Sequence, residues 1–209
     1  MENKATVYIV DDDHEVTSSL KWLIESVGYH VRVFHQPSDF LRNYQQGQVG
    51  CLILDVRMPE MSGLEVQEIM RRKQIHIPII FITGHGDIPM AVRAMKFGAT
   101  EFLTKPVNNQ MLLENINKAI KLDIQRREEA QEVAILRKRY ERLTPREKQV
   151  MELMIAGKLT KVIADELGIS PNTAELHRAK VMKKMEVKTL AELVNLTISN
   201  QLLAEKELA

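Results

Sequence analysis

Carboxylates follow two apolar runs of the sequence, and their placement suggests a site for a cation. Asp11, Asp12 and Asp13 directly follow the first run, and Asp55 follows the third. If these runs are strands of a parallel sheet, their ends can be neighbours, and several negative charges then share one pocket. Uncompensated like charges at such distances are strongly unfavourable, so we expect a cation between them. Carboxylate oxygens and water suit Mg²⁺ better than a transition metal.

A hydroxyl and an ammonium group stand at the ends of two further apolar runs. The fourth run ends in Thr83, and Lys105 follows the fifth. With the acidic residues, these groups provide what a bound phosphoryl group needs: a metal that offsets charge, a nucleophilic carboxylate and two donors for phosphoryl oxygens. Asp55 alone ends the third run opposite Asp11 and Asp12, so we expect Asp55 to be the nucleophile.

Basic residues gather near the C terminus, although the whole chain of 209 residues is almost neutral, with 29 Lys and Arg against 28 Asp and Glu. Between residues 178 and 188 the acid is Glu186, and the basic residues are Arg178, Lys180, Lys183, Lys184 and Lys188. This local excess favours contact with nucleic-acid phosphates. A solvated helix face is the alternative explanation.

Alternating strand and helix patterns predict the elements that position the acidic residues. The apolar runs expected as strands are Thr6–Val10, His30–Phe34, Cys51–Leu54, Pro78–Ile82 and Thr100–Leu103. The helical patterns between them are Thr17–Val27, Ser38–Gln45, Gly63–Arg72 and Ile88–Phe97, and a fifth begins near Asn108. This alternation predicts an α/β domain with a doubly wound, five-stranded parallel sheet. Such folds carry functional residues just beyond the carboxyl ends of their strands.

The fifth helical pattern continues to about Tyr140 and becomes dense in charge after Lys121. We interpret residues 122–142 as a helical linker. An apolar stripe along it suits a short helix-helix contact, and a solvated helix without a partner is the alternative. The stripe consists of Val133, Leu136, Tyr140 and Leu143.

Start and stop signals divide the rest of the chain into four short helices. Thr144 to Glu147 supply an N-cap, a proline at the first helical position and a capping-box Glu, and Ser170 with Pro171 starts another helix. Lys161–Leu167, the turn that begins at Gly168, and Pro171–Lys184 form a helix-turn-helix pattern, whose second helix normally enters the major groove.

The composition fits two small globular domains, because 44% of the residues are hydrophobic and 27% are charged. The single cysteine, Cys51, excludes an internal disulfide, and we expect it to be a small buried residue of a strand. No segment resembles a signal peptide or a membrane span, so we expect a cytoplasmic protein without membrane attachment.

Residues 5 to 120 resemble a response-regulator receiver domain, which has a flavodoxin-like fold. The motifs that carry the resemblance are Val10-Asp11-Asp12, Leu54 to Pro59, Met61-Ser62-Gly63, Thr83-Gly84, Gly98-Ala99 and Lys105-Pro106. The resemblance implies that a sensor histidine kinase phosphorylates Asp55. It also implies that Asp12, Asp55 and the Arg57 carbonyl bind Mg²⁺, with Asp11 acting mainly through water.

The same resemblance assigns Thr83 and Phe102 to the conformational switch, in which Thr83 moves toward the phosphate and an aromatic side chain changes rotamer. Phe102 stands where many relatives have Tyr, so it offers no hydroxyl for a hydrogen bond. His85 and Asp87 follow Thr83, and we expect them to be structural or surface residues.

The segment from Leu143 to Leu196 resembles the LuxR-type DNA-binding domain, and the two resemblances together identify a response regulator of the NarL/FixJ family. The matching landmarks include Glu147, Val150, Gly157, Lys161, Ile163-Ala164, Leu167, Thr173, His177, Met182 and Val187. The expected base-facing residues are Glu175, Leu176 and Ala179, and the expected phosphate contacts are Lys161, Thr173, Arg178 and Lys183. Ala174 and Glu175 depart from the usual valine and lysine of this family.

We therefore expect a receiver domain at 1–121, a linker at 122–142 and a helix-turn-helix domain at 143–209. The expected partners are a sensor histidine kinase, promoter DNA, RNA polymerase and a second copy of the chain. We expect phosphorylation to promote dimerisation through the face around Met90–Phe102, although release of an occluded DNA-binding domain would also explain control.

Two other functions could use some of the same residues. A phosphohydrolase of the haloacid-dehalogenase type would need a further acidic pair after Lys105, and residues 107–122 contain only Glu114. A constitutive DNA-binding protein with a degenerate receiver would not need the complete set of pocket residues. We therefore expect a phosphorylation-controlled regulator and no enzyme.

Overall fold

The computed structural model describes residues 5–84 and 88–199. The chain divides into two compact units, the first up to Arg127 and the second from Glu128. His85 and Asp87 lie outside the described residues. In the part of the chain that is described, no helix has both the length and the apolar character needed to cross a membrane.

The first unit is built on a parallel five-stranded sheet in the order β2-β1-β3-β4-β5, which confirms the expected fold class. Val- and Ile-rich segments form these strands because branched side chains pack well on a pleated, buried surface. The three central strands are buried along their whole length. The strands are β1 (Thr6–Val10), β2 (His30–Phe34), β3 (Gly50–Asp55), β4 (Ile79–Thr83) and β5 (Glu101–Thr104).

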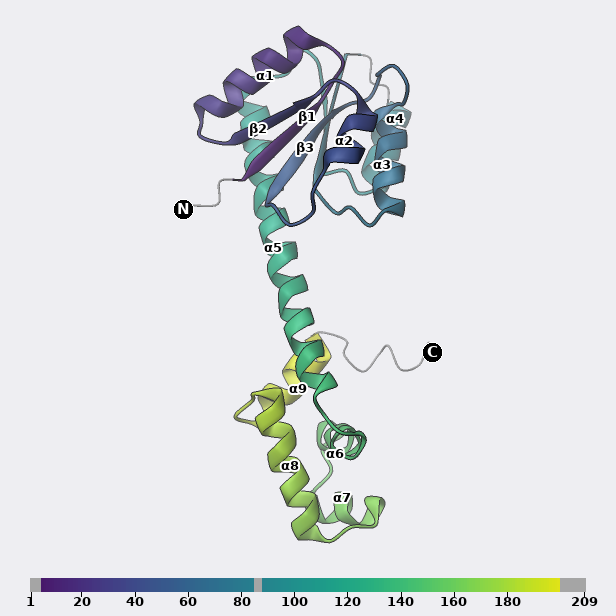
Figure 1. Ribbon diagram of the computed structural model, residues 1–209, viewed down its shortest axis with the longest axis vertical. Coiled ribbons are helices and arrows are strands. Elements are labelled where there is room, and N and C mark those ends of the chain that lie inside the picture. The colour runs from purple at the N-terminus through teal and green to yellow at the C-terminus, as the bar shows by residue number, and fades with distance from the viewer. Residues whose placement is uncertain (1–4, 85–87, 200–209) are drawn as a thin grey trace. The chain divides into compact units, whose positions relative to one another are not determined.

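Helices cover both faces of this sheet (Figure 1). Because side chains alternate along a strand, Tyr8 packs into one core and Ile9 into the other. The core that contains Tyr8 receives α2 (Pro37–Asn43), α3 (Gly63–Arg72) and α4 (Ile88–Lys96). The core that contains Ile9 and the fully buried Cys51 receives α1 (His14–Ser26) and the first part of α5 (Asn109–Glu141).

A buried carboxylate joins α5 to the N-terminal end of the central strand, β3. Asp123 is 3% exposed, and its Oδ2 accepts hydrogen bonds from the Gly50 backbone N–H at 2.9 Å and from Arg127 Nε at 2.7 Å. The backbone is so crowded there that a Cβ on Gly50 would lie 2.0 Å from the Thr6 carbonyl oxygen. Only glycine therefore fits this position.

The second unit is all helical and contains the helix-turn-helix. Its helices are α6 (Pro145–Ile155), α7 (Thr160–Leu167), α8 (Pro171–Met185) and α9 (Leu190–Ser199). Thr144 and Glu147 form the expected capping box, and Ser170 caps α8. Gly168 ends α7 in the left-handed conformation, with φ 63°, which glycine adopts without strain. These signals set the sharp turn that separates α7 from α8.

The last turns of α5 and the residues that directly follow it belong to the core of this second unit. Leu136 and Leu143 are 3% and 4% exposed, and Tyr140 packs against the same cluster as Val150 and Val181. Three of the four stripe residues thus pack inside their own unit. Val133 remains 39% exposed.

Candidate functional site

Three carboxylates meet where β1 and β3 end. The two strands pair in parallel, with Val10 opposite Leu54, so the residues that follow them emerge side by side. One carboxylate oxygen from each of Asp11, Asp12 and Asp55 lies within 4.8 Å of the others. Asp11 and Asp55 are buried, and Asp12 is exposed. The expected acidic cluster is therefore present at the expected edge of the sheet.

Lys105 lies against two of these carboxylates. Its Nζ is 2.6 Å from Asp11 Oδ2 and 3.6 Å from Asp55 Oδ1. The Lys105 backbone N–H donates to the Thr83 carbonyl at 2.8 Å, which fixes the lysine beside the end of β4. Burial alone would lower the pKa of Lys105, but the hydrogen bond and charge of Asp11 and the charge of Asp55 raise it above its usual value. The ammonium group is therefore held in its charged form.

One oxygen of the Asp55 carboxylate lacks a hydrogen-bond donor among the described residues. Burial raises its pKa, the positive charge of Lys105 opposes this rise, and the negative charge of Asp11 adds to it. Backbone N–H groups of Val56 and Arg57 also favour the ionised form. Among the described residues, Asp55 Oδ1 is buried without a hydrogen-bond partner, since Lys105 Nζ is within ion-pair but not hydrogen-bond distance. Such an oxygen is open to a metal ion or another cationic ligand.

The remaining residues expected at the pocket lie around this centre. Thr83 ends β4 next to β3 and is fully buried, and Arg57 follows β3 with its side chain exposed. Phe102 on β5 is partly buried, with its ring 6.1 Å from that of Phe81. Asp13 instead caps α1, accepting from the backbone N–H groups of Val16 and Glu15, and these bonds lower its pKa.

The expected base-facing residues lie on the exposed side of α8. Glu175, Leu176 and Ala179 are all exposed. The Glu175 carboxylate is already engaged, because its Oε2 accepts from Thr160 Oγ1 at 3.0 Å and lies 3.6 Å from Arg178 Nε. Sequence inspection missed this link, since Thr160 belongs to a different helix.

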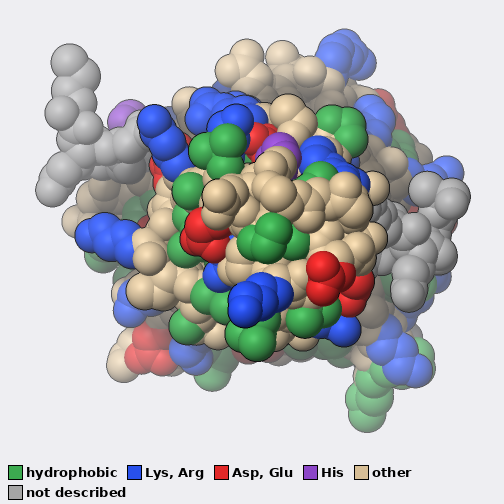
Figure 2. All heavy atoms as spheres, turned by 90° about the horizontal axis from the view of Figure 1, so that it is seen from below, with side chains coloured by type: hydrophobic (Ala, Val, Ile, Leu, Met, Phe, Trp, Pro, Cys, Tyr) green, Lys and Arg blue, Asp and Glu red, His purple; other side chains and the backbone are tan. Residues whose placement is uncertain are grey.

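The expected phosphate contacts differ in exposure. Lys161 and Lys183 are exposed, whereas the Arg178 side chain is only 22% exposed. Thr173 is partly buried in the first turn of α8, where its hydroxyl is 2.8 Å from Oγ of the N-cap residue Ser170. On the face that Figure 2 shows, basic side chains are interspersed with acidic and hydrophobic ones. These cations therefore differ in how freely they can reach a phosphate.

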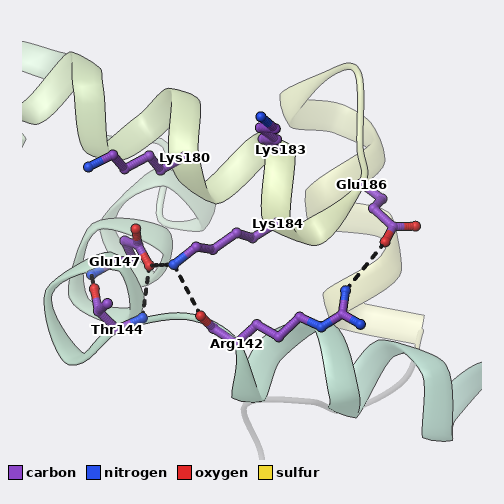
Figure 3. Close-up of a pocket in the computed structure, with 7 residues that line it drawn as sticks. All are labelled: Arg142, Thr144, Glu147, Lys180, Lys183, Lys184 and Glu186. Carbon is purple, nitrogen blue, oxygen red and sulfur yellow. Dashed lines mark hydrogen bonds and ion pairs between the residues drawn. The ribbon is translucent and has the colours of Figure 1, made fainter.

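An open pocket of about 560 Å³ lies between the end of α5, the start of α6 and the C-terminal half of α8 (Figure 3). Its lining residues are mostly charged: Arg142, Thr144, Glu147, Lys180, Lys183, Lys184 and Glu186. Lys184 Nζ crosses the pocket to Glu147 Oε2 at 2.6 Å and the Arg142 carbonyl at 3.1 Å. Arg142 had no local sequence signal, because its partners in the pocket, Lys184 and Glu186, are 42 and 44 residues away along the chain.

Family comparisons match both units. Residues 7–117 match the response regulator receiver domain, and residues 141–197 match the luxR family of bacterial regulatory proteins. The response regulator protein TodT of Pseudomonas putida is 48% identical over 198 residues, covering 94% of this chain and 87% of that protein. The transcriptional regulatory protein FixJ of Bradyrhizobium diazoefficiens is 42% identical over 201 residues, covering 95% and 97%. The solved structure of response regulator StyR matches with a TM-score of 0.86 at 46% identity, covering 94% of this chain and 99% of StyR.

Proposed function

Because this chain belongs to the NarL/FixJ family of two-component response regulators, with a receiver and a LuxR-type DNA-binding domain, we propose that a sensor histidine kinase phosphorylates it on Asp55. The observation that carries this proposal is the buried Asp55 carboxylate, whose Oδ1 has no hydrogen-bond partner in the described part of the chain and lies 3.6 Å from Lys105 Nζ. A nucleophile in this setting keeps an oxygen available for attack, with a cation beside it.

In the proposed reaction, a carboxylate oxygen of Asp55 attacks the phosphorus of a phosphohistidine. The P–N bond breaks, the imidazole leaves with the bonding electrons, and an aspartyl phosphate remains. Lys105 and Thr83 then donate to phosphoryl oxygens. The charged state of Lys105 supports its role, since an ammonium donates more strongly to phosphate than a neutral amine does.

The acidic cluster fits Mg²⁺. Asp12, Asp55 and the Arg57 carbonyl would hold the ion, with Asp11 acting through water. Bound there, Mg²⁺ offsets negative charge on the phosphoryl oxygens. The fit rests on three carboxylates within 4.8 Å of one another, of which Lys105 can offset only part.

We propose that the phosphorylated chain binds promoter DNA as a dimer and regulates transcription with RNA polymerase in the cytoplasm. Thr83 and Phe102 would change position with the phosphate: Phe102 lies on β5, which packs against α4, and Thr83 ends β4, the strand that precedes α4 in the chain. Three apolar side chains on α4 are open to solvent: Ile88 (80% exposed), Val92 (46%) and Met95 (45%). An apolar surface of this kind favours self-association.

The proposed division of labour places the receiver at 1–121, the linker at 122–142 and the DNA-binding domain at 143–209. Asp123 bonded to Gly50 and Leu136 packed against the second core support a linker that is anchored at both ends. Phosphorylation would switch the protein between two states of DNA binding, and the protein would not turn over a substrate as an enzyme does.

Phosphorylation of purified protein tests the acceptor directly. Mg²⁺ with acetyl phosphate should add one acid-labile phosphate to the wild type and none to Asp55→Asn, and Asp12→Asn should weaken labelling severely. The matched control is Asp13→Asn, which keeps a good N-cap on α1 and should label like the wild type. Undiminished labelling of Asp55→Asn, or loss of labelling in Asp13→Asn alone, would exclude this assignment.

A further inference from the structure

The pocket between α5, α6 and α8 has an uneven charge balance. Four cations and two carboxylates line it, which leaves a net charge of two positive units. The carboxylates do not oppose an incoming anion equally. Glu147 has a side chain that is 4% exposed; its charge is offset by Lys184 at 2.6 Å, and it accepts a hydrogen bond from the Thr144 backbone N–H at 2.8 Å, whereas Glu186 is about half exposed.

The cations at the rim of the pocket remain available. Lys180 and Lys183 are one turn apart on α8, and neither forms an ion pair within residues 5–84 and 88–199. Figure 3 shows them beside Lys184, whose amine reaches inward instead. Arg142 is 68% exposed and is held only loosely by Glu186, at 3.8 Å. Such a long, exposed ion pair stabilises little and is easily exchanged for a stronger partner.

Glu186 has a closer ion-pair partner in Arg139, which lies in the last turn of α5. Arg139 Nη2 lies 2.6 Å from Glu186 Oε2, and Arg139 Nη1 donates to the Met185 carbonyl at 3.3 Å. Arg139 thus fixes the end of α5 against the end of α8. The Arg142 guanidinium is consequently kept at the mouth of the pocket, on the side opposite Lys180 and Lys183.

We propose that this pocket is a phosphodiester-binding site, in which Arg142, directly after α5, and Lys180 and Lys183 of α8 contact backbone phosphates of the bound DNA. The proposal rests on the proposed DNA-binding function and extends the interface beyond the helix-turn-helix to the end of α5. A guanidinium binds phosphate with two parallel hydrogen bonds, so Arg142 gains more from a phosphate than from Glu186 at 3.8 Å.

The salt dependence of DNA binding by the full-length protein tests this site, because each phosphate contact contributes about 0.9 to the slope of log affinity against log salt. On a random-sequence duplex, Arg142→Gln should lower the slope by about 0.9 and the affinity by about threefold to tenfold. Glu186→Gln should act in the opposite direction and strengthen binding, because it releases Arg142 and keeps an amide oxygen for Arg139. Lys138→Gln is the matched control, since it removes an exposed cation from the last turns of α5, outside the pocket.

The outcomes separate the two proposals. Wild type that binds no duplex in any phosphorylation state contradicts the proposed function. If the wild type binds DNA but Arg142→Gln and Lys138→Gln change the affinity and the salt slope equally, the proposed phosphate site is wrong. It is also wrong if Glu186→Gln binds DNA more weakly while its midpoint of urea unfolding is unchanged. Inorganic phosphate, titrated at constant ionic strength, should compete with DNA. Phosphate that binds at about 1 mM or below without displacing the duplex would show a free-anion site instead and overturn the proposal.

Discussion

At the scale of single residues, the role proposed for Asp55 comes with a cost in stability. Burial raises its pKa above the usual value of 3.8, so the folded receiver binds this proton more tightly than the unfolded chain does. Stability therefore falls as pH rises from 3.8 through the folded pKa, and the full penalty persists above that pKa. A cation bound beside Asp55 would favour the ionised carboxylate and so reduce this loss of stability.

Asp55→Asn should consequently raise the melting temperature at pH 7 without Mg²⁺ by about 4 °C, which corresponds to roughly 1 kcal/mol in a domain of about 120 residues. Thermal unfolding followed by circular dichroism should show the difference vanishing below about pH 4, where both side chains are neutral. Mg²⁺ should stabilise the wild type more than the variant. A difference that grows on acidification would contradict this account.

Glu175 and Lys183 should separate specificity from affinity in DNA binding. Lys183→Ala should weaken binding to all sequences and lower the salt slope by about one counterion. Glu175→Ala should change which sites are preferred, either because the carboxylate reaches a base edge or because Arg178 is released from it. Selection from a random DNA library, followed by salt titration, measures both effects. Identical losses on selected and random DNA would refute this division.

At the scale of elements, strand ends were predictable and tertiary partners were not. The sequence placed Asp11, Asp55, Thr83 and Lys105 at one edge because a parallel sheet dictates that geometry. The apolar pattern predicted a helix that starts at Thr17, whereas α1 begins at His14 because Asp13 caps it. The local capping signal was present but was interpreted as part of the acidic pocket.

Other contacts had no local signal at all. Glu147 was recognised as a capping-box residue, and its pairing with Lys184 depends on how α6 and α8 pack. The bond between Glu175 and Thr160 likewise joins two helices. Patterns of period 2 or 3.6 specify which face of an element is buried, but they do not specify which polar residues of two elements will meet.

The junction between β3 and α5 depends on one acceptor. Asp123→Ala should leave the buried Gly50 N–H without a partner and lower the free energy of unfolding of the first unit by about 2 to 3 kcal/mol. Asp123→Asn keeps an acceptor oxygen and should cost clearly less. Urea unfolding of the full chain measures both variants. Equal losses in the two would mean that the charge, and not the hydrogen bond to Gly50, matters.

At the scale of the whole molecule, control depends on whether phosphorylation pairs two chains. Val92→Asp should place a charge in the exposed apolar surface of α4 and abolish dimerisation by the beryllofluoride-activated protein. Analytical ultracentrifugation at about 10 to 50 µM, a range where weak switch interfaces form, should show this loss. Val27→Asp, at the equally exposed end of α1, should still dimerise.

The contrary result is equally informative. Activated wild type that remains monomeric in this range, yet gains DNA affinity, would reject dimerisation through α4. It would favour release of an occluded helix-turn-helix. The sequence could not decide between dimerisation and release of the DNA-binding domain, because an exposed apolar helix face does not identify the partner that covers it.

The single cysteine of the chain, Cys51, is fully buried and can therefore report local unfolding of the receiver domain. Burial raises the pKa of this thiol far above the usual 9.0, so the folded sheet should leave it inert toward thiol reagents. The rate of thiol modification then measures how often β3 becomes accessible to solvent, and this rate can be compared with and without Mg²⁺ or phosphate. The same inertness leaves the chain free of background reactivity, so a cysteine engineered at an exposed position such as Lys138 could carry a fluorophore alone.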